Sequence, residues 1–208
     1  MKHFFAFLKH KGWAITLFLL CAVLFQSCSS IADYPTYAKK NTIVHVVVEI
    51  PAGTNKKIEY NAASNSFKAP LLDGKQRSIA YLPYIGNYGF IPGTFSNPRT
   101  GGDGDALDAL VLCERLYSGS VVTAKPIGIL KLTDNGERDY KVICIPSEEK
   151  LQTITANSFL ELSEKYPGML QIIELWFTNY NPLDPVEIIG WGDETEALSE
   201  INKALSEK

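Results

Sequence analysis

The chain has 208 residues, of which 46% are hydrophobic and 21% are charged, and its formal net charge is −3 at pH 7. This composition is typical of one globular domain and excludes a disordered or fibrous protein. The negative balance, with no lysine- or arginine-rich stripe after residue 28, argues against a nucleic-acid-binding protein.

Residues 1–28 have the pattern of an export signal. Three lysines in the first eleven residues precede an uncharged apolar run over 13–25, which is too short to span a membrane comfortably. A small residue and then Cys28 follow, which resembles the lipobox of bacterial lipoproteins, although Phe25 replaces the usual leucine. We therefore expect the protein to be exported and anchored to a bacterial membrane, on the periplasmic or cell-surface side, through a lipid on Cys28. A cleaved signal without lipid and an uncleaved anchor are the alternatives.

The next segment, 29–41, is polar and contains Pro35, which predicts a tether between the anchor and a folded domain over 42–208. The domain begins with Ile43 to Ile50, whose β-branched residues predict a strand that ends at Pro51. Two short strands, 57–60 and 66–68, follow and are separated by a turn rich in asparagine and serine.

Three further strands are predicted in the middle of the chain, over 107–113, 121–132 and 140–145. Pro126 and Gly128 predict a bulge in the second of them. The sequence Asp134-Asn135-Gly136 predicts the turn that leads into the third. Short strands punctuated by Gly, Pro and Asn are typical of a small β-barrel or sandwich.

The periodicity becomes helical after Pro146. Apolar residues recur at helical spacing over 159–162 and 170–177, and an amphipathic segment covers 194–205. We assign the aromatic residues of this region, Trp176, Phe177 and Trp191, to the core. The sequence thus predicts a mainly β protein with helices, an α+β fold in which a β-barrel precedes C-terminal helices.

Two cysteines, Cys113 and Cys144, lie within predicted apolar strands. Free cysteine is among the most buried residue types, and two isolated cysteines do not make a disulfide framework. Neither has the spacing of a zinc site. We expect two free thiols, with a disulfide between them as the alternative.

The most informative stretch is the acidic cluster Asp103, Asp105 and Asp108, which lies directly ahead of an apolar run. Three carboxylates this close repel one another and raise one another's pKa unless a cation neutralises them, and oxygen ligands suit hard divalent ions such as Mg²⁺. The cluster therefore predicts a metal site. A calcium-type loop and a solvated turn are the alternatives, but the spacing does not match an EF-hand and no turn requires Asp108 within an apolar strand.

Other charged residues lie on or beside the predicted strands. Alternation places Lys57 and Glu59 on one face of a strand, and Asp139 and Lys141 repeat the pattern. Buried charges are costly unless they face a cavity or solvent, so these pairs indicate a shared polar cavity suited to metal-assisted phosphoryl chemistry. A solvated face of an antiparallel sheet is the alternative.

Six stretches of the chain resemble the family I soluble inorganic pyrophosphatases, and they occur in the family's order between Ile43 and Ala204. They are 48–51, 57–59, 87–92, the acidic signature 103–108, 131–141 and 176–180. The resemblance implies a five-stranded OB-like barrel flanked by helices. It also implies Mg²⁺-dependent hydrolysis of pyrophosphate, a phosphorus anhydride, to two phosphates by a metal-activated water.

Carried over by position, the resemblance also implies a role for each site residue. The Mg²⁺ ligands would be Asp103, Asp105, Asp108, Asp134 and Asp139, together with Glu49 through water. The catalytic group would be Asp105, which helps to deprotonate the attacking water, with Glu59 and Tyr88 completing the polar network. The phosphate groups would be held by Lys57, Arg77, Lys141 and Tyr180. Relatives form dimers or hexamers, which implies self-association.

Two departures from the family follow. The family usually has a phosphate-binding lysine after the tyrosine that matches Tyr180, and this chain has Asn181. An exported enzyme also cannot remove pyrophosphate in the cytoplasm, so scavenging of extracytoplasmic phosphate is the expected role. The alternative function is a non-catalytic, pyrophosphate-binding lipoprotein that retains the fold.

Overall fold

The computed structural model describes residues 30–182 and 185–206. The expected export signal, with Cys28, lies outside the described residues. Within the described part of the chain, no helix is long and apolar enough to cross a bilayer.

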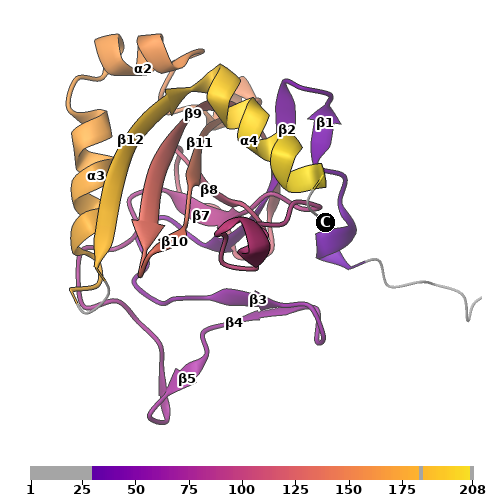
Figure 1. Ribbon diagram of the computed structural model, residues 1–208, viewed down its shortest axis with the longest axis vertical. Helices are drawn as coiled ribbons and strands as arrows, with labels where there is room; N and C mark the ends of the chain where they lie inside the picture. The colour runs from indigo at the N-terminus through magenta and orange to yellow at the C-terminus, as the bar shows by residue number, and fades with distance from the viewer. Residues whose placement is uncertain (1–29, 183–184, 207–208) are drawn as a thin grey trace, which may run out of the picture.

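Strands make up most of the regular structure, with helices towards the C-terminus (Figure 1). The strands are β1 (Tyr37–Lys39), β2 (Ile43–Ile50), β3 (Glu59–Asn61), β4 (Ser66–Lys68), β5 (Leu71–Leu72), β6 (Lys75–Gln76), β7 (Asn87–Phe90), β8 (Asp108–Val111), β9 (Val121–Asp134), β10 (Glu137–Arg138), β11 (Lys141–Pro146) and β12 (Val186–Asp193). The helices are α2 (Phe159–Lys165), α3 (Met169–Asn179) and α4 (Glu194–Ser206), with 3-10 turns η1 (Ile31–Asp33), η2 (Pro98–Thr100) and η3 (Glu149–Leu151).

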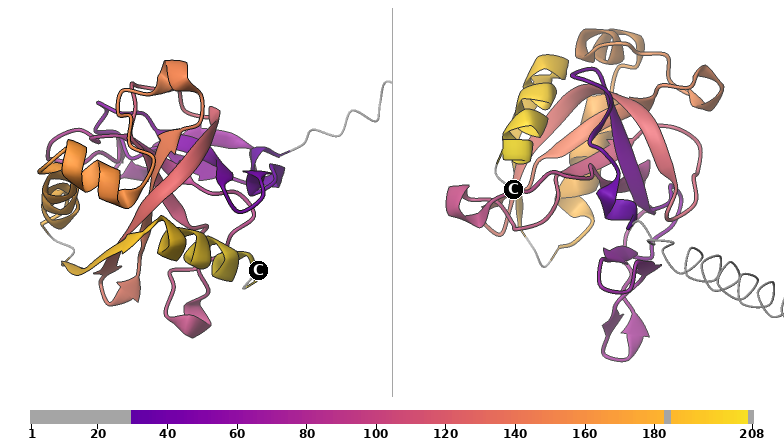
Figure 2. Two further views of the ribbon diagram at one scale, coloured as in Figure 1. Left: turned by 90° about the horizontal axis from the view of Figure 1, so that it is seen from above. Right: turned by 90° about the vertical axis from the view of Figure 1, so that its right-hand side faces the viewer.

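Five strands close into a barrel. β2 pairs with β7, β7 with β8, β8 with β11 and β11 with β9, and β9 returns to β2. Only the β8–β11 pairing in this ring is parallel. Figure 2 shows the crossed strands of the barrel with α4 lying outside them. The prediction of a five-stranded barrel flanked by C-terminal helices is confirmed.

Close contact between β2 and β7 depends on one glycine. A Cβ atom at Gly89 would lie 1.9 Å from the carbonyl oxygen of Val47, so any other residue would push these strands apart. β2 is buried over most of its length, with Val44, Val46, Val47 and Val48 fully buried. The predicted strand bounds match this element residue for residue.

The longest strand, β9, contains a bulge and ends in a tight turn. Ile143 of β11 lies opposite Gly128, whereas the next residue lies opposite Pro126, so Ile127 is the extra residue of a bulge. The strand ends in a two-residue turn in which Asn135 (φ 50°) and Gly136 (φ 85°) both adopt left-handed backbone conformations. This is the geometry of a type I′ hairpin turn, and both features were predicted from the sequence.

Two apolar clusters fill the space between the barrel and the helices. One contains Leu162, Ile173, Trp176 and Phe177 of α2 and α3, and the other contains Ala197, Ile201 and Ala204 of α4. The three predicted helices are therefore confirmed, and each presents its apolar face to the barrel.

Polar caps define where two of these helices begin. The Ser158 hydroxyl accepts a hydrogen bond from the backbone N–H of Glu161 (3.2 Å) at the start of α2. Asp193 accepts from the N–H groups of Thr195 (2.9 Å) and Glu196 (3.0 Å) at the start of α4. Both residues are strong N-cap formers, which explains why the chain turns into a helix at these points.

The structure corrects the sequence analysis in several segments. β12 was missed because helical periodicity was extended past Pro146, although Val186 and Ile188 are half-buried and their neighbours exposed, as strand alternation requires. The predicted tether is wrong at its C-terminal end, because β1 pairs with β2. β7 and the small β5–β6 hairpin were also missed, since four- and two-residue strands carry little periodic signal.

Cys113 and Cys144, the cysteines of the described part of the chain, are free thiols, as expected. Cys144 is fully buried in β11, and burial raises the pKa of its thiol. A buried, protonated thiol is unreactive, so we assign Cys144 to packing alone.

Candidate active site

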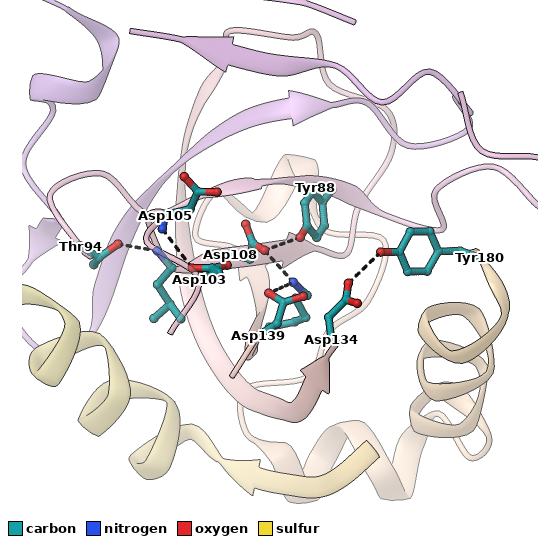
Figure 3. Close-up of polar contacts among 10 residues, drawn as sticks. Tyr88, Thr94, Asp103, Asp105, Asp108, Asp134, Asp139 and Tyr180 are labelled. Carbon is teal, nitrogen blue, oxygen red and sulfur yellow. Dashed lines mark hydrogen bonds and ion pairs between the residues drawn. The ribbon is translucent and has the colours of Figure 1, made fainter. Parts of the chain in front are cut away.

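A cavity of about 530 Å³ opens at one end of the barrel, between the barrel strands, the β3–β4 hairpin and the end of α3. Every site residue predicted from the sequence lines this cavity except Arg77. These residues are Glu49, Lys57, Glu59, Tyr88, Asp103, Asp105, Asp108, Asp134, Asp139, Lys141 and Tyr180. The fold therefore brings together carboxylates, cations and hydroxyls that lie far apart in the sequence (Figure 3).

Backbone hydrogen bonds hold the acidic cluster in a tight loop before β8. The N–H of Ser96 donates to the carbonyl of Asp105 (2.7 Å), and the N–H of Gly104 donates to the carbonyl of Ser96 (2.8 Å). The side chain of Asp103 accepts from the N–H of Asp105 (3.0 Å), which turns the chain back on itself. The buried Thr94 hydroxyl accepts from the N–H of Leu107 (2.9 Å), at the point where the loop enters the strand (Figure 3).

A buried lysine lies between two carboxylates at the centre of the site. Parallel pairing places Lys141 directly opposite Asp108. The ammonium of Lys141 donates to Asp108 Oδ2 (2.7 Å) and also bonds to Asp139 Oδ1. The hydroxyl of Tyr88 donates to the same oxygen of Asp108 (2.5 Å). Lys141 is 2% exposed, so these interactions take place away from bulk solvent.

Burial and charge pairing determine the pKa values of this group. Burial raises the pKa of Asp108 to about 6 despite the neighbouring ammonium. Burial also opposes the charged form of Lys141, but Asp108 and Asp139 outweigh it and raise the pKa of the ammonium. Lys141 therefore stays charged and acts as the fixed positive charge of the site.

A second carboxylate is held by the backbone of the β3–β4 hairpin. Glu49, near the end of β2, accepts a hydrogen bond at Oε1 from the N–H of Tyr60 (2.7 Å). Burial raises its pKa to about 7, with smaller contributions from the negative charges of Asp108, Glu59 and Asp105. This carboxyl group is consequently costly to ionise without a cation nearby.

The cations of the hairpin side lie next to one another. The N–H of Lys57 donates to the backbone carbonyl of Arg77 (3.0 Å), and the Arg77 guanidinium pairs with Glu59 (3.3 Å). Arg77 therefore does not line the cavity itself and contacts the cavity wall through its ion pair with Glu59. On the opposite side, the hydroxyl of Tyr180 approaches Asp134 Oδ2 (3.5 Å).

Aromatic residues that the sequence analysis did not assign to the site form part of its wall. Tyr84 packs on Trp176 with ring centroids 4.6 Å apart, and Trp176 stacks on Tyr180 at 5.2 Å with an interplanar angle of 5°. Phe177 also lines the cavity. Trp176 and Phe177 are buried core residues, as predicted, and the same helical face carries Tyr180 four residues after Trp176, a spacing that could have indicated their second role.

The donors in the cavity fit a hard divalent cation. Among residues 30–182 and 185–206, no three Asp, Glu, His or Cys side chains converge closely enough to form a preassembled metal cage. Mg²⁺ does not require one, because it keeps several waters and binds through a few carboxylates together with substrate phosphates. Burial raises the pKa values of Glu49, Asp103 and Asp108, so a cation bound beside them would favour their charged forms.

We expect the metal-free protein to lose stability as the pH rises. A glutamate free in water has a pKa of 4.5, whereas Glu49 in the fold has a pKa of about 7, so the folded state holds this proton more tightly than the unfolded chain. The stability that protonated Glu49 gives the fold is therefore fully present below pH 4.5 and is lost as the pH rises through 7. The loss should reach about 3 kcal/mol in the free energy of unfolding.

Urea unfolding of chelator-treated protein at pH 5 and pH 8 measures this loss of stability, and Glu49→Gln should remove most of the difference. An equal difference in that variant would contradict this origin.

Comparisons with known proteins agree with the geometry. A family model described as inorganic pyrophosphatase matches residues 46–208. The inorganic pyrophosphatase of Neisseria meningitidis serogroup B is 35% identical over 167 residues, covering 78% of this chain and 87% of the relative. That of Synechocystis is 32% identical over 169 residues, covering 80% and 92%.

Solved structures give the same result. The inorganic pyrophosphatase of Thermus thermophilus superimposes with a TM-score of 0.71 and 31% identity, covering 86% of this chain and 98% of that chain. The type I enzyme of Toxoplasma gondii gives a TM-score of 0.76 at 27% identity and covers 84% of each chain. The family model, the relatives and the barrel fold all lead to one conclusion: this chain belongs to the inorganic pyrophosphatase family.

Proposed function

We propose that the protein is an inorganic diphosphatase that hydrolyses pyrophosphate to two phosphates with Mg²⁺ as its cofactor. The observation that carries this proposal is the convergence of five aspartates, Glu49 and two lysines on one cavity in a member of the family. A polyanionic substrate needs cations, and the carboxylates need them as well, so metal ions between the two satisfy both requirements.

The metal-binding residues in this proposal are the five aspartates that line the cavity, with Glu49 acting through water. They are Asp103, Asp105, Asp108, Asp134 and Asp139. Mg²⁺ at this site would lower the pKa of a coordinated water and screen the charge of the phosphates.

Protein side chains would supply the remaining chemistry. Asp105, which is exposed to the cavity, accepts the proton of the water that attacks one phosphorus, while the bridging P–O bond breaks on the opposite side. Tyr88 fixes Asp108 by its hydrogen bond, and Glu59 orients Arg77.

Cations on both sides of the cavity would hold the substrate. Lys57 lines the cavity just ahead of β3, Lys141 lines it from β11 and the hydroxyl of Tyr180 from the end of α3, and Arg77, which pairs with Glu59 outside the lining, would complete the set. These groups would stabilise the charge that develops on the departing phosphate.

Phosphate release from pyrophosphate by the purified full chain in detergent tests the proposal. We expect release with Mg²⁺ and none after chelation of the metal. The rival function, a non-catalytic pyrophosphate-binding protein, predicts calorimetric binding of pyrophosphate without release. That result would overturn the assignment as an enzyme.

Asn181 offers a test of the phosphate side of the site. It follows Tyr180, and an amide supplies a hydrogen bond but no charge. A hydrogen bond to a charged group contributes about 1.5–3 kcal/mol, so Asn181→Lys should lower the KM for pyrophosphate by about tenfold. Asn179→Lys adds the same charge at the exposed end of α3, where Asn179 bonds to the carbonyl of Leu175, and should leave KM unchanged. An unchanged KM in Asn181→Lys would contradict a phosphate-binding role for this position.

We further propose that the chain is exported and lipid-anchored at Cys28. The support is the basic and apolar pattern of residues 1–28 and the lipobox-like sequence before Cys28. Metabolic labelling with palmitate should modify the wild type and not Cys28→Ser, which should leave the membrane fraction. Labelling of the variant at the wild-type level would contradict the proposal.

Self-association is the last part of the proposal. Exposed apolar side chains on α2, α3 and β12 support it, because contact with a second copy would remove their apolar surface from water. They are Leu160, Ile172, Leu175 and Ile189, with exposed fractions of 53–63%. Light scattering of the purified protein should give a mass above that of one chain, and the mass of a monomer would contradict it.

A further inference from the structure

The segment that precedes the barrel lies at the rim of the active site. This N-terminal arm, residues 30–36, contains η1, and its Ala32 lines the cavity. In the right-hand view of Figure 2, the indigo turn of the arm lies directly above the β3–β4 hairpin. The arm precedes the residues that the family model matches, 46–208.

One end of the arm is joined to the β3–β4 hairpin by side-chain hydrogen bonds. The Tyr60 hydroxyl donates a hydrogen bond to Asn65 Oδ1 (2.9 Å). Because its one hydrogen is used there, it accepts its second hydrogen bond from the Ser30 hydroxyl, which lies 2.6 Å away. The N–H of Ile31 donates to the same oxygen of Asn65 (3.4 Å). Ser30 is itself fixed, because it forms a reciprocal capping box with Asp33.

The other end of the arm is fixed to the barrel. The buried hydroxyl of Thr36 donates to the carbonyl of Pro92 (2.6 Å), and the carbonyl of Thr36 accepts from the N–H of His45 on β2 (2.9 Å). The rings of Tyr34 and His45 make an edge contact with centroids 5.6 Å apart. The arm therefore spans from a rigid barrel strand to the hairpin.

The hairpin has few other attachments to the barrel. β3 and β4 form a two-stranded sheet of their own, and isolated hairpins are only marginally stable. Tyr60 provides the main connections, because its N–H donates to Glu49 Oε1 (2.7 Å) and its ring packs on Phe90 at 5.8 Å. Movement of Tyr60 would shift Glu49 and also Glu59, the residue before it.

We propose that the N-terminal arm positions the active site: it holds Tyr60 through Ser30, and Tyr60 in turn orients Glu49 and the β3–β4 hairpin for metal and substrate binding. Ser30 and Tyr60 are positioning residues, since neither needs to contact the reacting atoms. This proposal rests on the proposed function for its kinetic readout but not for its measurement of metal binding.

Two conservative variants of the full chain in detergent test the arm. Ser30→Ala and Tyr60→Phe each remove a hydroxyl and keep the rest of the side chain. Both variants lose the Ser30–Tyr60 hydrogen bond, and each also loses a second bond of its hydroxyl, Tyr60 to Asn65 or Ser30 from the N–H of Ala32. The loss should raise the KM for pyrophosphate and the calorimetric Kd for Mg²⁺, measured without substrate, by about two- to tenfold. The kcat and the melting temperature should change little. Because the hydroxyls share one bond, the effects of the double variant should be less than additive.

Tyr37→Phe is the matched control. It removes a hydroxyl that bonds to Asn202 of α4 (3.0 Å), and neither residue lines the cavity, so KM and Kd should keep their wild-type values. Wild-type KM and Kd in both Ser30→Ala and Tyr60→Phe would overturn the proposal. So would a lower melting temperature with unchanged affinities, because that result describes a structural contact only. If the wild type releases no phosphate, the proposed function fails, and the Kd for Mg²⁺ alone decides the role of the arm.

Discussion

Replacing Lys141 with methionine should abolish pyrophosphate hydrolysis and destabilise the metal-free protein. Lys141 is 2% exposed and its ammonium bonds to Asp108 and Asp139, so removal leaves two largely buried carboxylates without their cation. Breaking a buried ion pair by removing one partner typically costs about 3–5 kcal/mol. We expect a loss of this size in the free energy of unfolding at pH 7, measured by urea denaturation after chelation, and at least a hundredfold lower kcat/KM.

The pH dependence of this destabilisation and a control variant show whether the unpaired carboxylates cause it. The destabilisation should shrink at pH 5, because Asp108, with a pKa of about 6, can then take up a proton instead of remaining charged. Lys131→Met removes another lysine that pairs with a carboxylate, Glu196, but at the surface, where such pairs contribute about 0–1 kcal/mol. Equal stability changes in the two variants would contradict the central position of Lys141.

The Asp105→Asn variant should lose catalysis and keep its fold. The Asp105 side chain faces the cavity, whereas its backbone N–H and carbonyl make the hydrogen bonds that hold the loop. The amide keeps these backbone bonds but cannot take a proton from the attacking water. General-base catalysis contributes about 10²–10⁴ in rate, so kcat should fall by that factor while the melting temperature changes by about 1 °C or less.

Asp73→Asn is the matched control for this substitution. Asp73 lies in the turn of the β5–β6 hairpin with φ 51°, a conformation that asparagine also tolerates, and it does not line the cavity. Its kcat should equal that of the wild type. A kcat within threefold of the wild type for Asp105→Asn would remove Asp105 from the catalytic step.

Much of the fold and the acidic part of the site could be predicted from strong local signals in the sequence, whereas the other site residues followed from the resemblance to a known family. Asn135-Gly136 permits few turns other than a hairpin, and the β-branched run of β2 permits few structures other than a buried strand. The acidic cluster indicated the site for a related reason, because repulsion among Asp103, Asp105 and Asp108 requires a cation.

The remaining features depend on contacts between distant segments. Tyr60 is an ordinary strand residue until the fold places Glu49 on one side of it and Ser30 on the other. Strand alternation predicted the pairing of Lys141 with Asp139, but its pairing with Asp108 follows from the parallel register of β8 and β11, which no local pattern encodes. The arm was interpreted as a tether because its polar composition gives no indication that Thr36 bonds to the barrel.

A single-turnover experiment tests the central claim most directly. With the full-length protein in excess over pyrophosphate and Mg²⁺ present, the reaction is quenched with acid and the phosphorus species are counted. A metal-dependent diphosphatase predicts two phosphates for each pyrophosphate consumed, and no phosphate when the metal is chelated. Recovery of intact pyrophosphate from protein that has bound it with Mg²⁺ would contradict the claim and identify a binding protein instead.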